Sequence, residues 1–320
     1  MKRVLKIAQM QFNMGFHLGY GIGEEYDRSA QIVYSDTISG ALCSVWAGQT
    51  STVKTFLDSF VLSSAMPIYR GRLFMPLPLD KHMVSIKDEP DAHKRIKRLQ
   101  WVEQPLWEEM AQTGRLIIDE QMISDCGSAI AVDSGRDIII QRAVVEQKVS
   151  VPIEGGDTEP YYFDKIYLGD GVSLGVIYET NDEKSFRRAF RLLADSGIGT
   201  SKSIGNGSFD VDFLTYDIEV DPTIESVQML SMWIPQREEC APEVLERSSY
   251  RLKLRGGYMA GASNFTHRHL MKLSVNMIES GSLIWNRDLK GTIVELRPAD
   301  VASHPVWRDG RALYLPFKKL

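Results

Sequence analysis

The chain contains little cysteine and no long apolar run. Its 320 residues include only three cysteines, Cys43, Cys126 and Cys240. Their odd number, their wide spacing and the lack of a Cys-x-x-Cys pair exclude a disulfide framework and a zinc ribbon. No window approaches the roughly 18 uninterrupted apolar residues of a membrane span, and the first residues lack the apolar core of a signal peptide. We therefore expect a soluble, unprocessed protein of the reducing cytoplasm, with no membrane contact.

An excess of basic residues is also missing. The chain has 37 Lys and Arg against 42 Asp and Glu, so its formal net charge is −5. Any contact with nucleic acid must therefore come from local patches, because the overall field does not attract phosphates. The hydrophobic content of 43% and the length are enough for a large core and predict roughly two domains.

Two familiar nucleotide motifs are absent. No Gly-Lys-Ser or Gly-Lys-Thr occurs in the chain, which excludes a P-loop. A dinucleotide fingerprint counted from Gly197 needs glycine at its sixth position, where Lys202 stands, and the expected order here is helix then strand rather than strand then helix. A nucleotide-binding enzyme that uses the glycine-rich stretch 197–209 without either motif stays an alternative.

The most informative stretch that is present runs from Gly197 to Phe209 and lies between a helix-like and a strand-like segment. Glycines allow a left-handed backbone and let a ligand approach the main chain closely, so that successive N–H groups converge on an anion. We predict that this stretch holds phosphates through its glycines, one hydroxyl and one cation: Gly197, Gly199, Gly205, Gly207, Ser203 and Lys202.

Periodicity predicts the elements around this loop. Residues 3–12 read as a first strand that enters a glycine-rich segment, and a helix follows with Ser35 as its N-cap. Residues 65–79 hold three prolines and suggest an edge strand. A second helix carries one apolar stripe from Phe186 to Ala194, and alternation from Phe209 predicts a half-buried strand.

Each half of the chain thus begins with a strand and a helix and has further paired strands, which is the β-α-β-β order of ferredoxin-like modules. We predict an α+β protein of two tandem ferredoxin-like (RRM-like) domains with Gly-rich loops and an inserted helical or hairpin segment. The first domain covers residues 1–155, with a charged, helix-prone insertion at about 80–120. The second covers residues 156–320 and carries the loop 197–209.

Several motifs taken in order resemble one known family. They are Phe16-His-Leu-Gly19, Tyr34-Ser-Asp-Thr-Ile-Ser-Gly-Ala-Leu-Cys43, Glu159-Pro-Tyr-Tyr-Phe163, the loop Gly197–Phe209, Arg255-Gly-Gly257 and His304-Pro-Val-Trp-Arg-Asp-Gly310. Together they resemble the RAMP superfamily of CRISPR-associated proteins, in particular its Cas5-like group and the fourth subunit of the type III-A Csm effector complex. Thr200 and Asn206 depart from the family's usual glycine and phenylalanine in the loop, which puts base stacking by its tip in doubt.

The resemblance implies a noncatalytic, cofactor-free subunit of a CRISPR-Cas particle that acts in antiviral defence. Such subunits bind the 5′ repeat-derived tag of the CRISPR RNA. They also bridge the large palm-domain subunit to the backbone RAMP subunits. A type III-B counterpart has the same architecture and role, so overall resemblance alone separates the two.

Single-stranded RNA is recognised through phosphates, 2′-hydroxyls and base edges, which requires close backbone approach and a few cations. Besides the loop, the candidate RNA contacts are Arg255 and Gly256 at a strand end, the helix N-terminal Ser35 and Ser39, and the isolated His17, Arg70, Arg72 and Arg142. Asp36 would repel a phosphate beside Ser35, so capping is the alternative role there. The glycine pair after Arg255 has an alternative role in a hairpin or bulge.

His17 separates two function classes. RAMP ribonucleases that mature CRISPR RNA use a histidine for proton transfer to a 2′-hydroxyl, so His17 is the catalytic candidate if the chain is such an endoribonuclease. No second acid or base can be paired with it from sequence. His267 and His269 alternate without an acidic or cysteine neighbour, and we expect no metal site.

Overall fold

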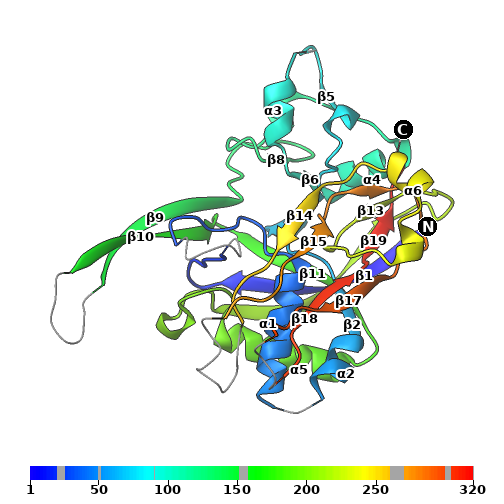
Figure 1. The fold of residues 1–320 in the computed structure, drawn as a ribbon. Helices are drawn as coiled ribbons and strands as arrows, with labels where there is room; N and C mark the ends of the chain where they lie inside the picture. The colour runs from blue at the N-terminus through cyan, green and yellow to red at the C-terminus, as the bar shows by residue number, and fades with distance from the viewer. Residues whose placement is uncertain are drawn as a thin grey trace.

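The computed structural model describes residues 1–19, 26–49, 52–89, 91–150, 158–259, 270–299 and 304–319. It is a mixed α+β protein with one large sheet, several small two- and three-stranded sheets and few helices (Figure 1).

The helices and strands fall into three stretches of the chain. The first contains β1 (Lys2–Phe12), α1 (Ser35–Ala47), α2 (Val53–Asp58), β2 (Phe60–Leu62), β3 (Met66–Tyr69), β4 (Arg72–Pro76), β5 (Val84–Ile86), α3 (His93–Arg98), β6 (Trp101–Glu103), α4 (Gln104–Thr113), β7 (Leu116–Ile118) and β8 (Ala129–Ile130). The second contains β9 (Gln141–Ser150), β10 (Glu159–Leu168), β11 (Val172–Thr180), α5 (Glu183–Ser196) and β12 (Phe209–Glu219). The third contains β13 (Val227–Met229), α6 (Pro242–Glu246), β14 (Leu252–Arg255), β15 (Val275–Ile278), β16 (Leu283–Ile284), β17 (Gly291–Glu295), β18 (Trp307–Arg311) and β19 (Tyr314–Pro316).

The centre of the fold is a β-α-β-β-α-β unit. In chain order it consists of β1, α1, β2, β11, α5 and β12, and its strands lie side by side in the order β12-β1-β11-β2. All three neighbouring pairs are antiparallel. Residues 63–171 are inserted between β2 and β11, so the unit is closed by strands far apart in sequence.

The amphipathic pattern of α5 explains how the helices cover this sheet. Phe186, Phe190 and Leu193 share one stripe and are fully buried. They pack with Ala8 and Met10 of β1 in one apolar cluster that also includes residues of α1 and α2. Asp182 caps the helix, because its carboxylate accepts the backbone N–H of Ser185 at 3.1 Å.

The inserted residues build two features (Figure 1). The strands β3, β4, β6 and β8 continue the large sheet beyond β11 and carry a small lobe with α3 and α4. The strands β9 and β10 form a long antiparallel hairpin that projects away from the rest of the molecule.

The third stretch of the chain, called the C-terminal stretch below, packs in part on the sheet face opposite α1 and α5, while its β18 packs against α1. Leu5 and Ile7 of β1 share an apolar cluster with Leu313, Leu315 and Phe317. The indole Nε1 of Trp107 in α4 donates to the side chain of Gln228 at 2.6 Å. The C-terminal residues are thus part of the same core as β1.

The structure corrects several predicted boundaries. The predicted domain junction at 155/156 does not coincide with a break in the sheet, since β1 lies between β11 and β12. For the same reason the loop after α5 belongs to the unit that begins with β1. Residues 65–79 form not an edge strand but the hairpin β3–β4 inside the sheet, with Pro67 opposite Leu174. The insertion is longer than the predicted 80–120.

Among the described residues, no helix has the length and apolar character needed to cross a membrane.

Candidate nucleic-acid interface

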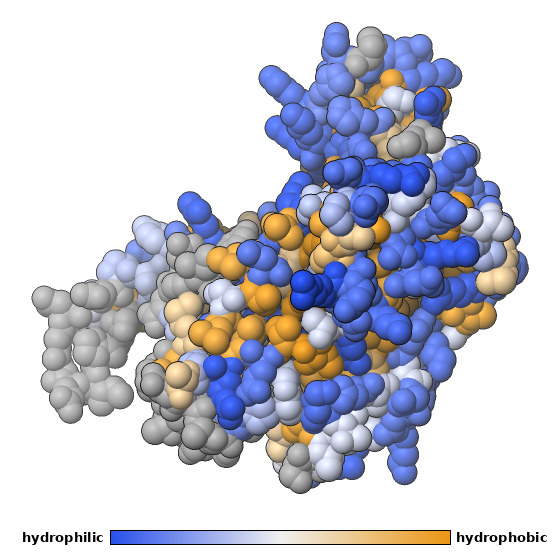
Figure 2. All heavy atoms as spheres, turned by 45° about the vertical axis from the view of Figure 1, so that its right-hand side comes forward, coloured by the Kyte–Doolittle hydropathy of each residue, from blue (hydrophilic) through white to orange (hydrophobic). Residues whose placement is uncertain are grey.

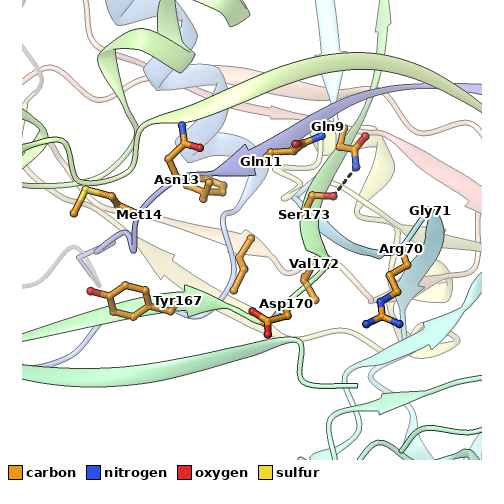
Figure 3. Close-up of a pocket in the computed structure, with 14 residues that line it drawn as sticks. Gln9, Gln11, Asn13, Met14, Arg70, Gly71, Tyr167, Asp170, Val172 and Ser173 are labelled. Atoms are coloured by element: carbon orange, nitrogen blue, oxygen red, sulfur yellow. Dashed lines mark hydrogen bonds between the residues drawn. The ribbon is translucent and has the colours of Figure 1, made fainter. Parts of the chain in front are cut away.

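A polar pocket of about 560 Å³ lies on the sheet face that α1 and α5 leave open (Figure 3). Two turns wall it: the turn between β3 and β4, and the turn between β10 and β11. In Figure 3, Arg70 stands at one end, Met14 and Tyr167 stand at the other, and Asp170 lies between them.

Amide side chains of β1 and of Asn13, which follows it, line this pocket. Gln9 donates to the hydroxyl of Ser173 at 2.6 Å, and Gln11 donates to Asp212 of β12 at 3.3 Å. Asn13 donates to Asp210 at 3.4 Å. These exposed carboxylates repel phosphate along β12, whereas uncharged amides and a hydroxyl suit the edges of nucleobases.

Arg70 occupies a strained turn. Arg70 and Gly71 have φ values of 49° and 81°, and they join β3 to β4 as a two-residue hairpin. A left-handed conformation costs an L residue other than glycine or asparagine about 1 kcal/mol or more. The exposed guanidinium lies 5.2 Å from the ring centre of Tyr69 and lines the pocket. A strained turn that presents a cation into a pocket favours a binding role over a purely structural one.

The glycine-rich loop adjoins the pocket at Met14, which is exposed and lines the pocket, and whose sulfur lies 3.7 Å from the position of a Cβ on Gly205. Buried contacts of the segment 13–17 hold the two together. The backbone N–H of Gly207 donates to the carbonyl of Gly15 at 3.2 Å, and the backbone N–H of Asn13 donates to the carbonyl of Ser208 at 3.4 Å. Gly15 lies against the ring of Tyr167, so the loop, this segment and the pocket form one continuous surface.

Close packing explains several of the loop's glycines. A Cβ on Gly199 would lie 2.1 Å from the carbonyl oxygen of His17, and one on Gly207 would lie 2.0 Å from that of Ile198. A Cβ on Gly197 would meet the carbonyl of Asn206 at 2.9 Å. At Gly205, by contrast, the nearest atom is the sulfur of Met14 at 3.7 Å. Glycine is therefore needed at the first three positions for the loop's own packing rather than for the approach of a ligand.

Two side chains of the loop have buried polar atoms without hydrogen-bond partners among the described residues. Asn206 is 1% exposed, and neither its Nδ2 nor its Oδ1 has a partner among the described residues. The hydroxyl oxygen of Thr200 is also buried and has no hydrogen-bond partner among the described residues. Buried polar atoms are rarely left unsatisfied, so these atoms favour a ligand or solvent at the loop. Lys202 is exposed on the short helical turn Lys202–Ile204, which also includes Ser203.

One face of the hairpin β9–β10 interleaves cations with aromatic rings. Arg142 lies opposite Tyr167, and Lys148 lies opposite Tyr161. The ammonium of Lys148 stands 4.2 Å from the ring centre of Phe163 and 3.8 Å from the carboxylate of Glu146. Phe163 is 1% exposed, so the groups that this face offers to a ligand are the exposed Arg142 and Tyr161 and the half-buried Tyr167. Single-stranded nucleic acid is bound by such surfaces, because cations follow the phosphates while rings stack on bases. Through Tyr167 this face reaches the pocket.

His17 is buried rather than free in a flexible loop. Its side chain is 1% exposed, its Nδ1 lies 2.8 Å from the carbonyl oxygen of Asp164, and its ring lies 4.8 Å from that of Phe163. Its backbone carbonyl accepts the N–H of Thr200 at 3.0 Å. In this arrangement His17 fixes the loop to β10, and its imidazole cannot reach a 2′-hydroxyl.

Arg255 is a correction to the predicted contacts. It is 8% exposed and forks onto Asp36, with Nε to Oδ2 at 2.9 Å and Nη2 to Oδ1 at 3.2 Å. Arg308 binds the same carboxylate. Burial acts to raise the pKa of Asp36, but the two guanidinium groups outweigh it and hold the pKa below its usual range. Gly256 is also engaged, because its carbonyl accepts from Arg308 at 2.6 Å.

The predicted cap and anion site at the start of α1 are likewise replaced by internal contacts. The N-cap is Tyr34, whose side chain makes no capping hydrogen bond to the helix. The hydroxyl of Ser35 accepts the N–H of Met232 at 2.8 Å, and that of Ser39 donates to the carbonyl of Asp36 at 3.3 Å. Both serines are buried. Ser35 thus binds the C-terminal stretch and Ser39 binds its own helix, so neither hydroxyl faces an anion site.

The other predicted arginines differ in their surroundings. Arg72 is half-buried and pairs with Glu103 at 3.2 Å. Arg70 and Arg142 are exposed. The structure therefore brings together the loop, Arg70 and Arg142, and it separates Arg255, Ser35 and Ser39 from them.

Sequence reasoning missed most of the pocket. The sequence pattern that could have revealed the pocket is the alternation of Gln9, Gln11 and Asn13 with the apolar Ala8, Met10 and Phe12. This alternation predicts one polar face of the sheet. Tyr167, Asp170 and Ser173 carry no local signal, since only the fold brings them to β1. Within the described residues, no group of three His, Cys, Asp or Glu side chains is placed to hold a metal ion. His267 and His269 lie outside the described residues.

These features define a class of protein: an α+β fold whose β-α-β-β-α-β sheet carries an open polar pocket next to a glycine-rich loop. Residues 224–317 match the family model described as the CRISPR Csm4 C-terminal domain. The Csm4 protein of Methanocaldococcus jannaschii is 20% identical over 374 residues, covering 97% of this chain and 96% of that protein.

Two solved structures share the fold. A chain of the crystal structure of a Csm1-Csm4 cassette in complex with cA4 matches with 17% identity and a TM-score of 0.65, over 99% of each chain. A chain of the Csm3-Csm4 subcomplex of the type III-A interference complex matches with 16% identity and a TM-score of 0.65, over 98% of this chain and 99% of the other. The chain is thus similar to Csm4 proteins in its C-terminal domain and in its fold, which confirms the resemblance noted from sequence.

Proposed function

We propose that this chain is a noncatalytic subunit of a type III-A Csm effector complex in the cytoplasm, where it binds the 5′ tag of the CRISPR RNA. The observation that carries the proposal is one continuous surface made of the open pocket, the glycine-rich loop and the basic, aromatic face of β9–β10. Amides in the pocket meet base edges, and Arg70, Arg142 and Lys202 meet phosphates. The predicted two RRM-like modules remain part of this proposal; the β-α-β-β-α-β unit supports one such module, which is built from elements of both predicted domains.

The bridging role needs surfaces for two protein partners, the large palm-domain subunit and a backbone RAMP subunit. Figure 2 shows apolar side chains gathered across the middle of one face of the molecule, between more polar regions. The hairpin β14–β15 and its flanks expose several large apolar side chains: Leu252, Leu254, Tyr258, Met271 and Leu273, each 39% to 59% exposed. Exposed apolar groups so close together favour a protein contact.

The RNA proposal is tested by binding of a fluorescent single-stranded RNA that carries the repeat-derived tag. We expect Arg70→Gln with Arg142→Gln to weaken binding and to reduce the salt slope by about 1.4, since each lost phosphate contact removes roughly 0.7. The matched control is Lys184→Gln with Arg188→Gln, which removes two exposed cations of α5 on the opposite face. An equal effect of both pairs would contradict the proposal.

The bridging role is tested by copurification. Leu252→Ser with Leu254→Ser should lower recovery of one partner subunit. Ile117→Ser, at a residue that is 69% exposed elsewhere, serves as the control. Full recovery of both partners with the Leu252/Leu254 variant would show that this face binds neither partner subunit.

The endoribonuclease alternative predicts metal-free cleavage of repeat RNA that is lost in His17→Ala. The burial of His17 favours no cleavage. A nucleotide-binding enzyme that uses the glycine-rich loop would instead bind ATP with a micromolar dissociation constant. Such binding, if it is lost in Lys202→Ala, would count against the proposed role.

A further inference from the structure

A second cavity, of about 290 Å³, lies where the inserted lobe meets the C-terminal stretch. Its walls come from the residues before α1, the chain after β4, the end of α3 and the strands β14 and β15. None of its lining residues lines the pocket of Figure 3.

The cavity is strongly basic. Four cations line it, and the lining includes one carboxylate. They are Lys81, Lys97, Arg251 and Lys253 against Glu279. The lining therefore carries an excess of three positive charges, in a protein whose net charge is −5.

Internal donors already occupy the single carboxylate. Glu279 is 6% exposed and accepts from the hydroxyl of Tyr34. Arg251 and Lys253 approach its two oxygens at 3.4 and 3.5 Å. Glu279 thus neutralises at most one of the four cations and leaves little capacity for the others.

Lys81 is the cation with the clearest need for an anion. Its ammonium donates to the carbonyl of Leu99 at 2.8 Å, and no carboxylate of the described residues lies within ion-pair distance of it. Burial, with a smaller contribution from Arg251, lowers the pKa of Lys81 to about 8. Lys81 and Arg251 repel each other beside the cavity, and an anion bound between them would stabilise the charged form of both.

We propose that this cavity binds a phosphate group, supplied either by the backbone of an RNA strand or by a free nucleotide. Phosphate offers several oxygens to several donors at once, and its charge of −1 to −2 reduces the excess of three. Lys81 supplies a point charge from the wall, while the side chain of Arg251, 64% exposed, supplies a planar fork from the rim. This inference does not rest on the proposed function, because it uses different residues.

The test titrates the full chain with two probes: 5′-AMP, and a short single-stranded RNA without terminal phosphates. We expect the double variant Lys81→Met, Arg251→Gln to bind at least one probe about tenfold more weakly. The control variant Lys94→Met, Arg115→Gln removes two exposed cations that do not line the cavity and should bind like the parent chain. Urea denaturation verifies that both variants are folded.

Each outcome either identifies the source of the phosphate or contradicts the proposed binding site. A loss for RNA alone assigns the backbone phosphate, and a loss for 5′-AMP alone assigns a free nucleotide. Unchanged binding of both probes overturns the inference. So does a loss seen only with a labelled oligoglutamate peptide, which would make the cavity a site for protein carboxylates. An unaffected Arg70/Arg142 variant refutes the proposed function but leaves this site standing.

Discussion

At the scale of single residues, Asp36 illustrates how a motif noted from sequence acquired its role from distant partners. Its carboxylate is fully buried and joins the start of α1 to Arg255 and Arg308, more than 200 positions later. Removal of one member of a buried ion network leaves uncompensated charge in the interior, which usually costs about 3 to 5 kcal/mol.

We therefore expect Asp36→Asn to lower the free energy of unfolding by about 3 kcal/mol or more, as measured by urea denaturation. Asp217→Asn is the control, because Asp217 is exposed and stands 4.0 Å from Lys2. A loss no larger than that of the control would show that the network contributes little to stability.

The loop glycines permit a second residue-scale prediction. Both Gly199 and Gly205 have left-handed backbones, but only Gly199 faces a backbone oxygen at clashing distance. We expect Gly205→Ala to cost about 1 kcal/mol and Gly199→Ala roughly 3 kcal/mol, measured by thermal unfolding. Equal costs would indicate that backbone conformation alone requires these glycines.

Lys81 predicts a pH dependence. Its pKa is about 8 in the folded chain and 10.5 in the unfolded chain, so the unfolded state holds more protons between these values. Stability contributed at this site therefore rises as the pH increases from about 8 to about 10.5. The difference in unfolding free energy between the parent and Lys81→Met should change over this range by on the order of 1 to 3 kcal/mol. A constant difference would contradict the lowered pKa.

At the scale of elements, the β3–β4 turn combines strain with exposure. Arg70 has a φ of 49°, a conformation that asparagine adopts more readily. We expect Arg70→Asn to raise stability by about 0.5 to 1 kcal/mol while it weakens RNA binding. Denaturation and RNA titration of the same protein test both parts. A variant that is less stable, or that binds RNA as well as the parent, would show that the arginine is not retained for binding.

Elements with a strong pattern of their own were predictable. The strand predicted at 3–12 is β1 at Lys2–Phe12, and the apolar stripe from Phe186 to Ala194 lies on α5. Short elements with mixed composition were not. The proline-rich residues 65–79 read as an edge strand, yet β11 and β6 flank their hairpin on both sides.

At the scale of the whole molecule, the C-terminal stretch completes the core of the first unit. Its Leu230, Leu283 and Phe317 pack in the same cluster as Leu5 and Ile7 of β1. It also supplies both arginines that neutralise Asp36.

We therefore expect a chain truncated after residue 223 not to form a cooperative fold. Its thermal transition should be broad, and it should bind a hydrophobic dye, because the sheet face under the C-terminal stretch becomes exposed. The full-length chain is the control. A sharp transition in the truncated chain would show that the β-α-β-β-α-β unit folds independently.

The sequence by itself determined the features that depend on near neighbours: the class of fold, the two covering helices, the glycine-rich loop and the resemblance to Csm4-like proteins. Tertiary structure alone decided which candidates share a surface. It turned Arg255, Ser35, Ser39 and His17 inward and brought Tyr167 and Ser173 to β1. The physical reason is that burial and pairing depend on partners that a large insertion and a distant C-terminal stretch provide, and no local pattern records those partners.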